Sequence, residues 1–74
     1  MSREVFILIR KFKGMRQSEY ARWLGITPAY VNMIESGARS VSEKIECFIA
    51  LNFDAASAEF LEFVRRYENL KELG

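Results

Sequence analysis

The short link between two predicted helices is the feature that most constrains this chain. One helical pattern covers about residues 17–24 and the next begins at Pro28, so that only Gly25-Ile26-Thr27 joins them. Gly25 suits the end of the first helix, because glycine adopts a left-handed conformation without strain. Ala21 is small enough to let the two helices cross closely, and Ile26 in the turn can fill the core beneath them. We therefore expect two short helices that cross at a tight turn.

The second helix of this pair is sharply bounded. Thr27 is a good N-cap, and Pro28 fits the first helical position, where its missing N–H is harmless. Val31 and Ile34 point to one side, and Gly37 closes the helix after roughly two to three turns. A helix anchored on one side only is predicted to protrude, which leaves its other side free to meet a partner.

A further helix is predicted before this pair. Ser2 can cap it, and Gly14 ends it. Its apolar residues recur at helical spacing, namely Val5, Leu8, Ile9 and Phe12. Phe6 and Ile7 fall off this stripe, so they either touch a partner or widen the buried face.

Two more helices are predicted after the pair. Ser40-Val41-Ser42-Glu43 reads as a capping box with Glu43 at the third helical position. The residues expected to face the core from this fourth helix are Ile45, Phe48, Ile49 and Leu51. The fifth helix, over about 55–72, begins near Asp54 or Ser57 and has a wide apolar face. That face consists of Phe60, Leu61, Phe63, Val64, Tyr67 and Leu70.

Five helices without a strand predict an all-α protein that forms one domain over residues 1–74. Half of the residues are apolar, which allows a hydrophobic core at this length. No apolar run approaches the roughly 18 residues of a membrane span. The run Val5–Ile9 is too short for a signal-peptide core, so a cytoplasmic protein is expected.

The composition argues against an enzyme. The chain has no His and a single Cys, Cys47, so it lacks the residues of a zinc site and of an intrachain disulfide. No glycine-rich phosphate loop and no nucleophile with a positioned base is visible. No metal and no cofactor is therefore expected.

The charge is distributed unevenly along the chain. Residues 1–42 carry seven basic and three acidic side chains, whereas residues 43–74 carry four basic and seven acidic ones. A polyanion would therefore meet the N-terminal part, although uneven surface charge alone also explains the pattern.

The pair of helices around the Gly25-Ile26-Thr27 turn resembles a known family of proteins. From Met15 to about Ile49 the chain resembles the lambda-repressor-like Cro/CI (XRE-type) helix-turn-helix proteins, with the helix-turn-helix over about 17–36. The ordered set that carries the resemblance is Gln17, Glu19, Ala21, Leu24, Gly25, Ile26, Thr27, Val31, Ile34, Glu35, Ser36, Gly37 and Arg39. The likeness extends over roughly residues 3–53 and implies double-stranded DNA as the partner.

The resemblance implies a role for each matching position. Gln17 matches a glutamine that binds a DNA phosphate and braces the recognition helix. Arg10 and Glu35 match an internal ion pair between the first and third helices. The positions that face the groove are Thr27, Pro28, Ala29, Asn32 and Met33, and those beside the backbone past that helix are Ser36 and Arg39.

The chain departs from the family pattern in its base readers. Pro28 and Ala29 have no side chain that hydrogen-bonds a base edge, although Ala29 can pack on a thymine methyl. Asn32 is then the best candidate for a base contact, and Tyr30 can reach a phosphate or a base or pack on a neighbouring helix. Arg16, which is a poor N-cap, can bind phosphate instead. We expect part of the specificity to come from DNA shape.

The fifth helix has two readings. Its apolar face completes the core, or part of it forms a dimer contact; the candidate dimer residues are Phe60, Phe63, Val64, Tyr67 and Leu70. A homodimer is expected, since DNA readers of this type bind two half-sites. The predicted function is a transcriptional regulator, a repressor of phage or mobile-element type that occupies its operator. The alternative is a protein-interaction module, or an antitoxin-like protein that docks a protein partner with the same fold.

Overall fold

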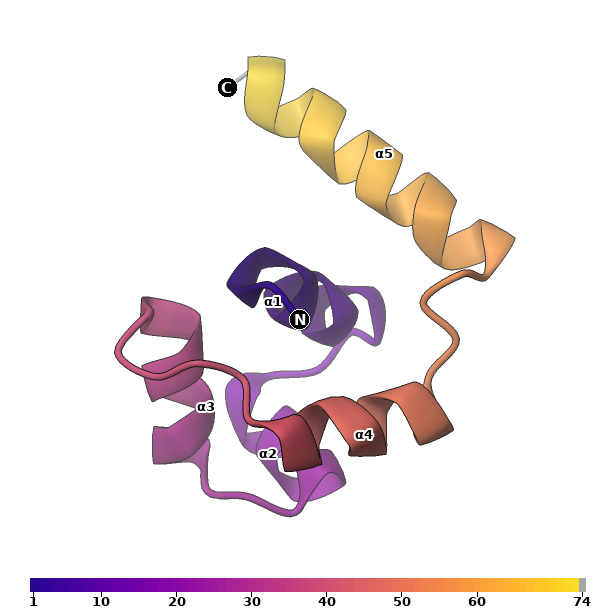
Figure 1. Cartoon of the computed structure of the whole chain (residues 1–74). Coiled ribbons are helices and arrows are strands. Elements are labelled where there is room, and N and C mark those ends of the chain that lie inside the picture. The colour runs from indigo at the N-terminus through magenta and orange to yellow at the C-terminus, as the bar shows by residue number, and fades with distance from the viewer. Residues whose placement is uncertain (74) are drawn as a thin grey trace.

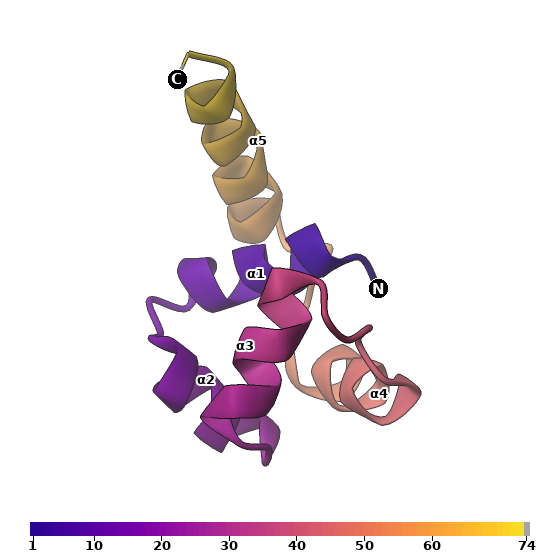
Figure 2. The ribbon, with the colours of Figure 1, turned by 90° about the vertical axis from the view of Figure 1, so that its left-hand side faces the viewer.

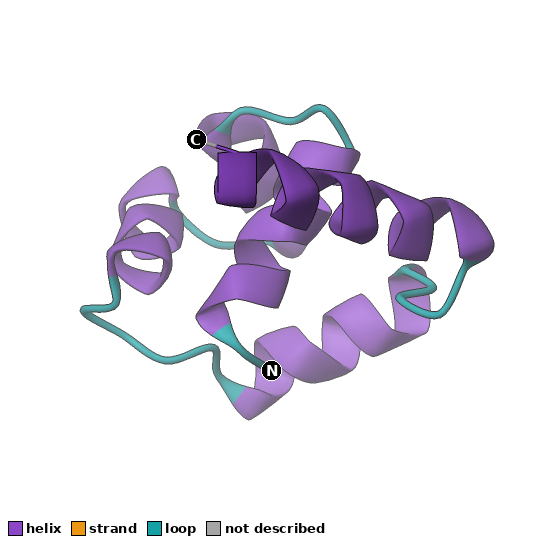
Figure 3. Ribbon diagram, turned by 90° about the horizontal axis from the view of Figure 1, so that it is seen from above, coloured by secondary structure: helices purple, strands orange, loops and turns teal. Residues whose placement is uncertain are grey.

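The computed structural model describes residues 1–73, which form five α-helices joined by short turns (Figure 1). The helices are α1 (Arg3–Phe12), α2 (Gln17–Leu24), α3 (Pro28–Ser36), α4 (Glu43–Asn52) and α5 (Ala58–Leu73). The expected all-α fold is confirmed, and residues 1–73 contain no strand. α1 lies at the centre, with α2 and α4 on one side of it and α5 on the other (Figures 1 and 2). Seen from above, α5 is the nearest element (Figure 3).

All five helices contribute to one hydrophobic cluster. Its buried members are Phe6, Leu8, Ile9, Tyr20, Ala21, Leu24, Val31, Ile34, Ile45, Ile49 and Phe60. Tyr20 lies at the centre, where its ring is 4.9 Å from that of Phe6 and its hydroxyl donates to the Phe6 carbonyl at 2.9 Å. Burial raises the pKa of the Tyr20 hydroxyl, and the nearby charge of Glu35 adds to the rise.

Phe6 is fully buried, so the reading in which it widens the buried face of α1 is correct and no partner reaches it. Ile7, in contrast, stays half-exposed. The apolar stripe of α1 is broad because α1 is surrounded by the other helices and buries more than one side.

Two predictions about α4 are wrong. Its N-cap is Ser42, whose hydroxyl accepts from the Ile45 N–H at 3.2 Å, so Glu43 is the first helical residue and the capping box from Ser40 does not form. Leu51 is 85% exposed and does not face the core. The core face of α4 consists of Ile45 and Ile49, with Phe48 at its edge.

The fifth helix begins after Ser57, whose hydroxyl accepts from the Phe60 N–H at 3.2 Å. It packs on the end of α1 through edge-to-face aromatic contacts. The ring of Phe12 lies 5.3 Å from that of Phe60 and 5.4 Å from that of Phe63. Phe60 is only 3% exposed, so this candidate dimer residue is part of the core and has no surface left for a second copy.

The wide apolar face expected on α5 is also only partly buried. Leu61 and Leu70 are 55% and 67% exposed. No helix among residues 1–73 is long and apolar enough to cross a membrane.

Candidate nucleic-acid interface

The outward side of α3 is the candidate recognition surface. Val31 and Ile34 are fully buried and fix one side of the helix to the core. On the opposite side Ala29, Asn32 and Ser36 recur at helical spacing, and all three are exposed. The helix therefore presents one polar and small-residue face. Figure 2 shows α3 on the side nearest the viewer.

Both ends of α3 form as the sequence predicts. The Thr27 hydroxyl accepts from the Tyr30 N–H at 3.1 Å, and Pro28 occupies the first turn. Gly37 ends the helix with a φ of 89°, a left-handed conformation that side chains rarely adopt. Because the Thr27 oxygen already caps the helix, it points at the backbone of α3 rather than freely outward.

A chain of polar contacts ties α3 to the two helices before it. Glu35 accepts from Arg10 twice, at 2.7 Å from Nε and at 3.0 Å from Nη2. Arg10 also donates from Nη1 to the carbonyl of Met15 at 3.0 Å. The same Glu35 accepts from the Gln17 side-chain amide at 3.1 Å. One carboxylate thus links α1, α2 and α3, and the ion pair implied by the family resemblance is present.

The same chain of contacts ends at the outward face. The Asn32 amide donates to Gln17 Oε1 at 3.5 Å, the outer limit of a hydrogen bond. Gln17 therefore connects the ion pair of Arg10 and Glu35 to Asn32. The arrangement orients two side chains of the candidate surface before any ligand arrives.

The start of α2 differs from the start of the other helices. Ser2, Thr27, Ser42 and Ser57 each accept a hydrogen bond at the start of α1, α3, α4 and α5. The corresponding position of α2 is Arg16, whose own side chain accepts no such bond within residues 1–73, although the Glu19 carboxylate accepts from its backbone N–H at 2.8 Å. The first N–H groups of α2 are then open to an acceptor from outside, and a helix N-terminus favours an anion there.

A family model described as Helix-turn-helix matches residues 8–45, just over half of the chain. The chain belongs to the Cro/CI-type helix-turn-helix family. No curated protein and no solved structure matches it. Membership implies DNA binding and a role in transcriptional regulation, and domains of this family are typically non-enzymatic.

In this helix-turn-helix protein, Arg16 is not a free cation. Its backbone N–H donates to Glu19 Oε1 at 2.8 Å, and its guanidinium Nε lies 3.4 Å from the same oxygen. The backbone hydrogen bond, more than the guanidinium, lowers the pKa of Glu19. The Arg16 side chain is 85% exposed, so it can turn toward a phosphate when one is present.

Other candidate DNA contacts lie around the edges of α3. Tyr30 and Met33 are half-buried, and the Arg39 guanidinium lies 5.8 Å from the centre of the Tyr30 ring. The Ser36 hydroxyl donates to the Met33 carbonyl at 3.1 Å, within the same helix. Tyr30, a residue of α3, thus both packs against the core and lies beside Arg39.

Trp23 has a packing role. Its ring stacks on Tyr20 at 5.9 Å and meets the edge of Phe48 at 5.1 Å, and the Lys13 ammonium lies 4.4 Å above it.

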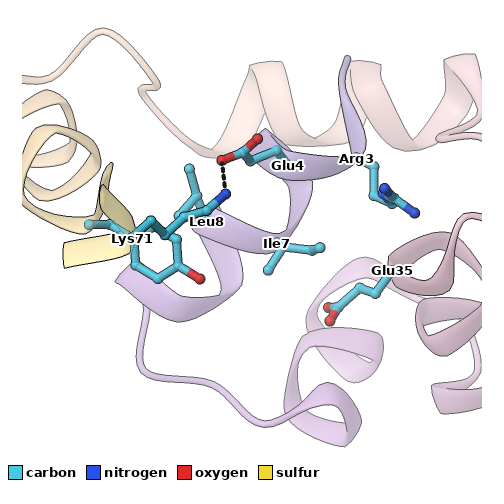
Figure 4. Close-up of a pocket in the computed structure, with 7 residues that line it drawn as sticks. Arg3, Glu4, Ile7, Leu8, Glu35 and Lys71 are labelled. Atoms are coloured by element: carbon cyan, nitrogen blue, oxygen red, sulfur yellow. Dashed lines mark hydrogen bonds and ion pairs between the residues drawn. The ribbon is translucent and has the colours of Figure 1, made fainter. Parts of the chain in front are cut away.

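Sequence reasoning missed the residues around a hollow of about 360 Å³ between α1, the end of α3 and α5. Figure 4 shows Glu4 and Lys71 joined on one side of this hollow, at 3.3 Å, and Glu35 on the other. Arg3 points away from that ion pair toward α3. No local pattern marks Arg3, because its neighbours come from residues more than thirty positions away.

Proposed function

We propose that this chain is a sequence-specific regulator that binds double-stranded DNA and represses transcription by occupying its operator, in the manner of a phage or mobile-element repressor. Residues 1–74 would act as one domain. The proposed DNA contacts are Arg16, Gln17, Thr27, Pro28, Ala29, Tyr30, Asn32, Met33, Ser36 and Arg39. The observation that carries the proposal is the exposed face of α3 beside the uncapped start of α2.

The two features suit DNA in different ways. A helix fits the major groove, where side chains meet base edges, while N–H groups at a helix start bind a phosphate. The face of α3 is small and polar, so its backbone can approach the bases closely. Since Ala29 and Pro28 offer no hydrogen bond, Asn32 is the base reader of this proposal.

Selection of bound duplexes from a random pool tests the function. Enrichment of one palindromic sequence, with binding that weakens steeply as salt rises, is the expected result. A pool that stays unenriched would contradict sequence-specific binding. Binding of a protein partner with no affinity for any duplex would favour the docking module instead.

Asn32→Ala tests the base reader. We expect a loss of about 1–3 kcal/mol of discrimination at one base position, because one bidentate contact to adenine disappears. Asn69→Ala, which removes the same side chain from the exposed end of α5, is the control. Equal discrimination by Asn32→Ala and wild type would assign the reading to other residues.

We also propose that the protein binds its operator as a homodimer. Because Phe60 is buried, the apolar surface of α5 proposed for the dimer contact consists of the exposed Leu70 and the half-buried Phe63 and Tyr67. Phe63 and Tyr67 precede Leu70 by seven and three residues, which places the three side chains on one face of the helix. Val64 is half-buried and turns further toward the core. Leu70→Ser should then lower the sedimentation coefficient on DNA toward that of a complex with one copy. A wild-type complex whose mass equals the duplex plus one 8.6 kDa copy would refute the dimer.

A further inference from the structure

A second hollow, of about 290 Å³, lies beside the end of α3. Its walls come from the first residues of the chain and from the segment that joins α3 to α4. The lining residues are Met1, Arg3, Ile34, Gly37, Arg39, Ser40 and Val41. Two arginines and one serine hydroxyl are thus its polar groups, and no carboxylate among the described residues lines it.

Neither arginine has its charge neutralised within the chain. Arg3 and Arg39 take part in no ion pair within residues 1–73, whereas Arg10, Arg16, Arg65 and Arg66 all do. The amino group of Met1 is held by Glu46 at 2.7 Å, so it does not compete for the hollow. Two unpaired guanidinium groups beside one small hollow favour an anion there.

The backbone of Gly37 lets Arg3 take this place. The guanidinium of Arg3 lies so close that a Cβ atom on Gly37 would stand 2.5 Å from Nη1. Gly37 is needed for its φ of 89°, and its lack of a side chain leaves room for the flexible Arg3 guanidinium beside it. Arg39 also lines this hollow, and its guanidinium lies 5.8 Å from the centre of the ring of Tyr30, which is not among the lining residues.

The position of the hollow suits one kind of anion. A helix in the major groove nearly fills its width, so groups beside the end of the helix meet the sugar-phosphate backbone. Figure 2, which faces the outer side of α3, shows the N-terminus next to the segment after α3. The hollow thus lies beside the end of the candidate recognition helix, since Ile34 and Gly37 line it.

We propose that Arg3, together with Arg39 and Ser40, forms a pocket for a backbone phosphate of the DNA, at the opposite end of α3 from the phosphate site at the start of α2. This inference rests on the proposed function and adds Arg3 and Ser40 to its contacts. The pocket fixes α3 at both ends against the duplex. Guanidinium forks suit phosphate oxygens because they offer parallel N–H donors.

The test compares Arg3→Gln with Arg66→Gln on the selected duplex. Both variants remove one positive charge, but Arg66 lies on α5 and is paired with Glu62 at 2.9 Å. Arg3→Gln should weaken binding about tenfold, as for one charge-assisted hydrogen bond, and flatten the salt slope by about one. Arg66→Gln should change neither quantity.

A double variant shows whether the two arginines share one phosphate. Arg3→Gln combined with Arg39→Gln should lose less affinity than the product of the single losses, because the second change removes a contact that the first has already weakened. Multiplicative losses would place the two arginines on separate phosphates and overturn the shared pocket.

Two further results would overturn the proposal. If Arg3→Gln binds duplex like the wild type but unfolds at a lower temperature, Arg3 only balances the carbonyl groups at the end of α3. If inorganic phosphate saturates the Arg3 and Arg39 side-chain resonances at concentrations that leave duplex binding unchanged, the hollow is a site for a free anion. A wild-type protein that binds no duplex would instead refute the proposed function itself, and this contact with it.

Discussion

The recognition helix and the last helix are held to the same core by different forces. α3 is fixed by directional bonds, since one carboxylate, that of Glu35, accepts from both Arg10 and Gln17. α5 is held by aromatic edges around Phe12 and by one surface ion pair, between Lys71 and Glu4. Aromatic contacts stabilise in proportion to the area that they bury. A hydrogen-bonded carboxylate also fixes the rotation of its helix about the helix axis and the position of the helix along that axis. Directional bonds are thus found where the position of a side chain matters most.

Phe60→Ala should cause the largest loss of stability, and this loss should affect mainly α5. The side chain is 3% exposed, so a cavity in the aromatic cluster should cost about 3–5 kcal/mol of unfolding free energy. Urea unfolding measures the loss, and hydrogen exchange measures where it falls. Leu61→Ala, on the same helix but 55% exposed, should change stability by less than about 0.5 kcal/mol. Equal loss of amide protection in α3 and α5 would show that the two regions unfold as one unit.

Glu35→Gln tests the directional hydrogen bonds that hold α3. It leaves Arg10, whose side chain is only 17% exposed, without its carboxylate, which should cost about 2–3 kcal/mol. Duplex affinity should fall as well, because Gln17 loses its orientation. Glu62→Gln removes an exposed carboxylate from α5 and should leave both the unfolding midpoint and DNA binding unchanged. If DNA affinity survives in Glu35→Gln, the network serves stability alone.

Tyr20→Phe removes the buried hydrogen bond that joins α2 to α1. The loss of the bond to the buried Phe6 carbonyl should cost about 1–2 kcal/mol in urea unfolding near neutral pH.

The same residue should make stability depend on alkaline pH. Burial raises the pKa of Tyr20 from its usual value of 10.0, so the folded protein keeps the proton that the unfolded chain releases. This contribution is fully present below about pH 10 and is lost as the pH rises further. Urea midpoints measured from about pH 9 to pH 11 should fall more steeply for the wild type than for Tyr20→Phe. Parallel curves would assign the alkaline loss to other groups.

Ser42→Ala should have the smallest effect on stability. It tests where α4, which lies between α3 and α5 in the chain, begins. Loss of the cap of α4 should cost about 1 kcal/mol, and Ser40→Ala should change stability little. Thermal unfolding of both variants decides between the two serines. A larger loss in Ser40→Ala would restore the capping box that the sequence suggested.

The sequence predicts the helix boundaries of the recognition pair well because their signals are local. Thr27, Pro28 and Gly37 each act through their own backbone or through the next turn. The start of α4 is predicted two residues too early, because Ser40 and Ser42 can both cap a helix and the structure uses Ser42. Leu51 was misplaced for a related reason: helical spacing defines a side of α4, but the neighbours that cover it come from elsewhere in the chain.

The candidate site shows the same division. The family pattern implies the ion pair between Arg10 and Glu35 and points to Gln17 separately. The fact that one carboxylate serves both depends on how three helices cross. Arg3 carries no signal at all, since its place beside Gly37 joins positions 34 residues apart. Local chemistry therefore predicts the elements, and tertiary packing decides which side chains meet.

The uncapped start of α2 has a consequence for the free protein. A serine or aspartate at position 16 would stabilise the helix by about 1 kcal/mol, and the chain forgoes this stability. A bound phosphate would complete the helix in place of that side chain. The DNA phosphate would then supply the hydrogen-bond acceptor that the helix lacks. The protein would reach its full stability only when bound to its target, so that folding and binding become two parts of one equilibrium.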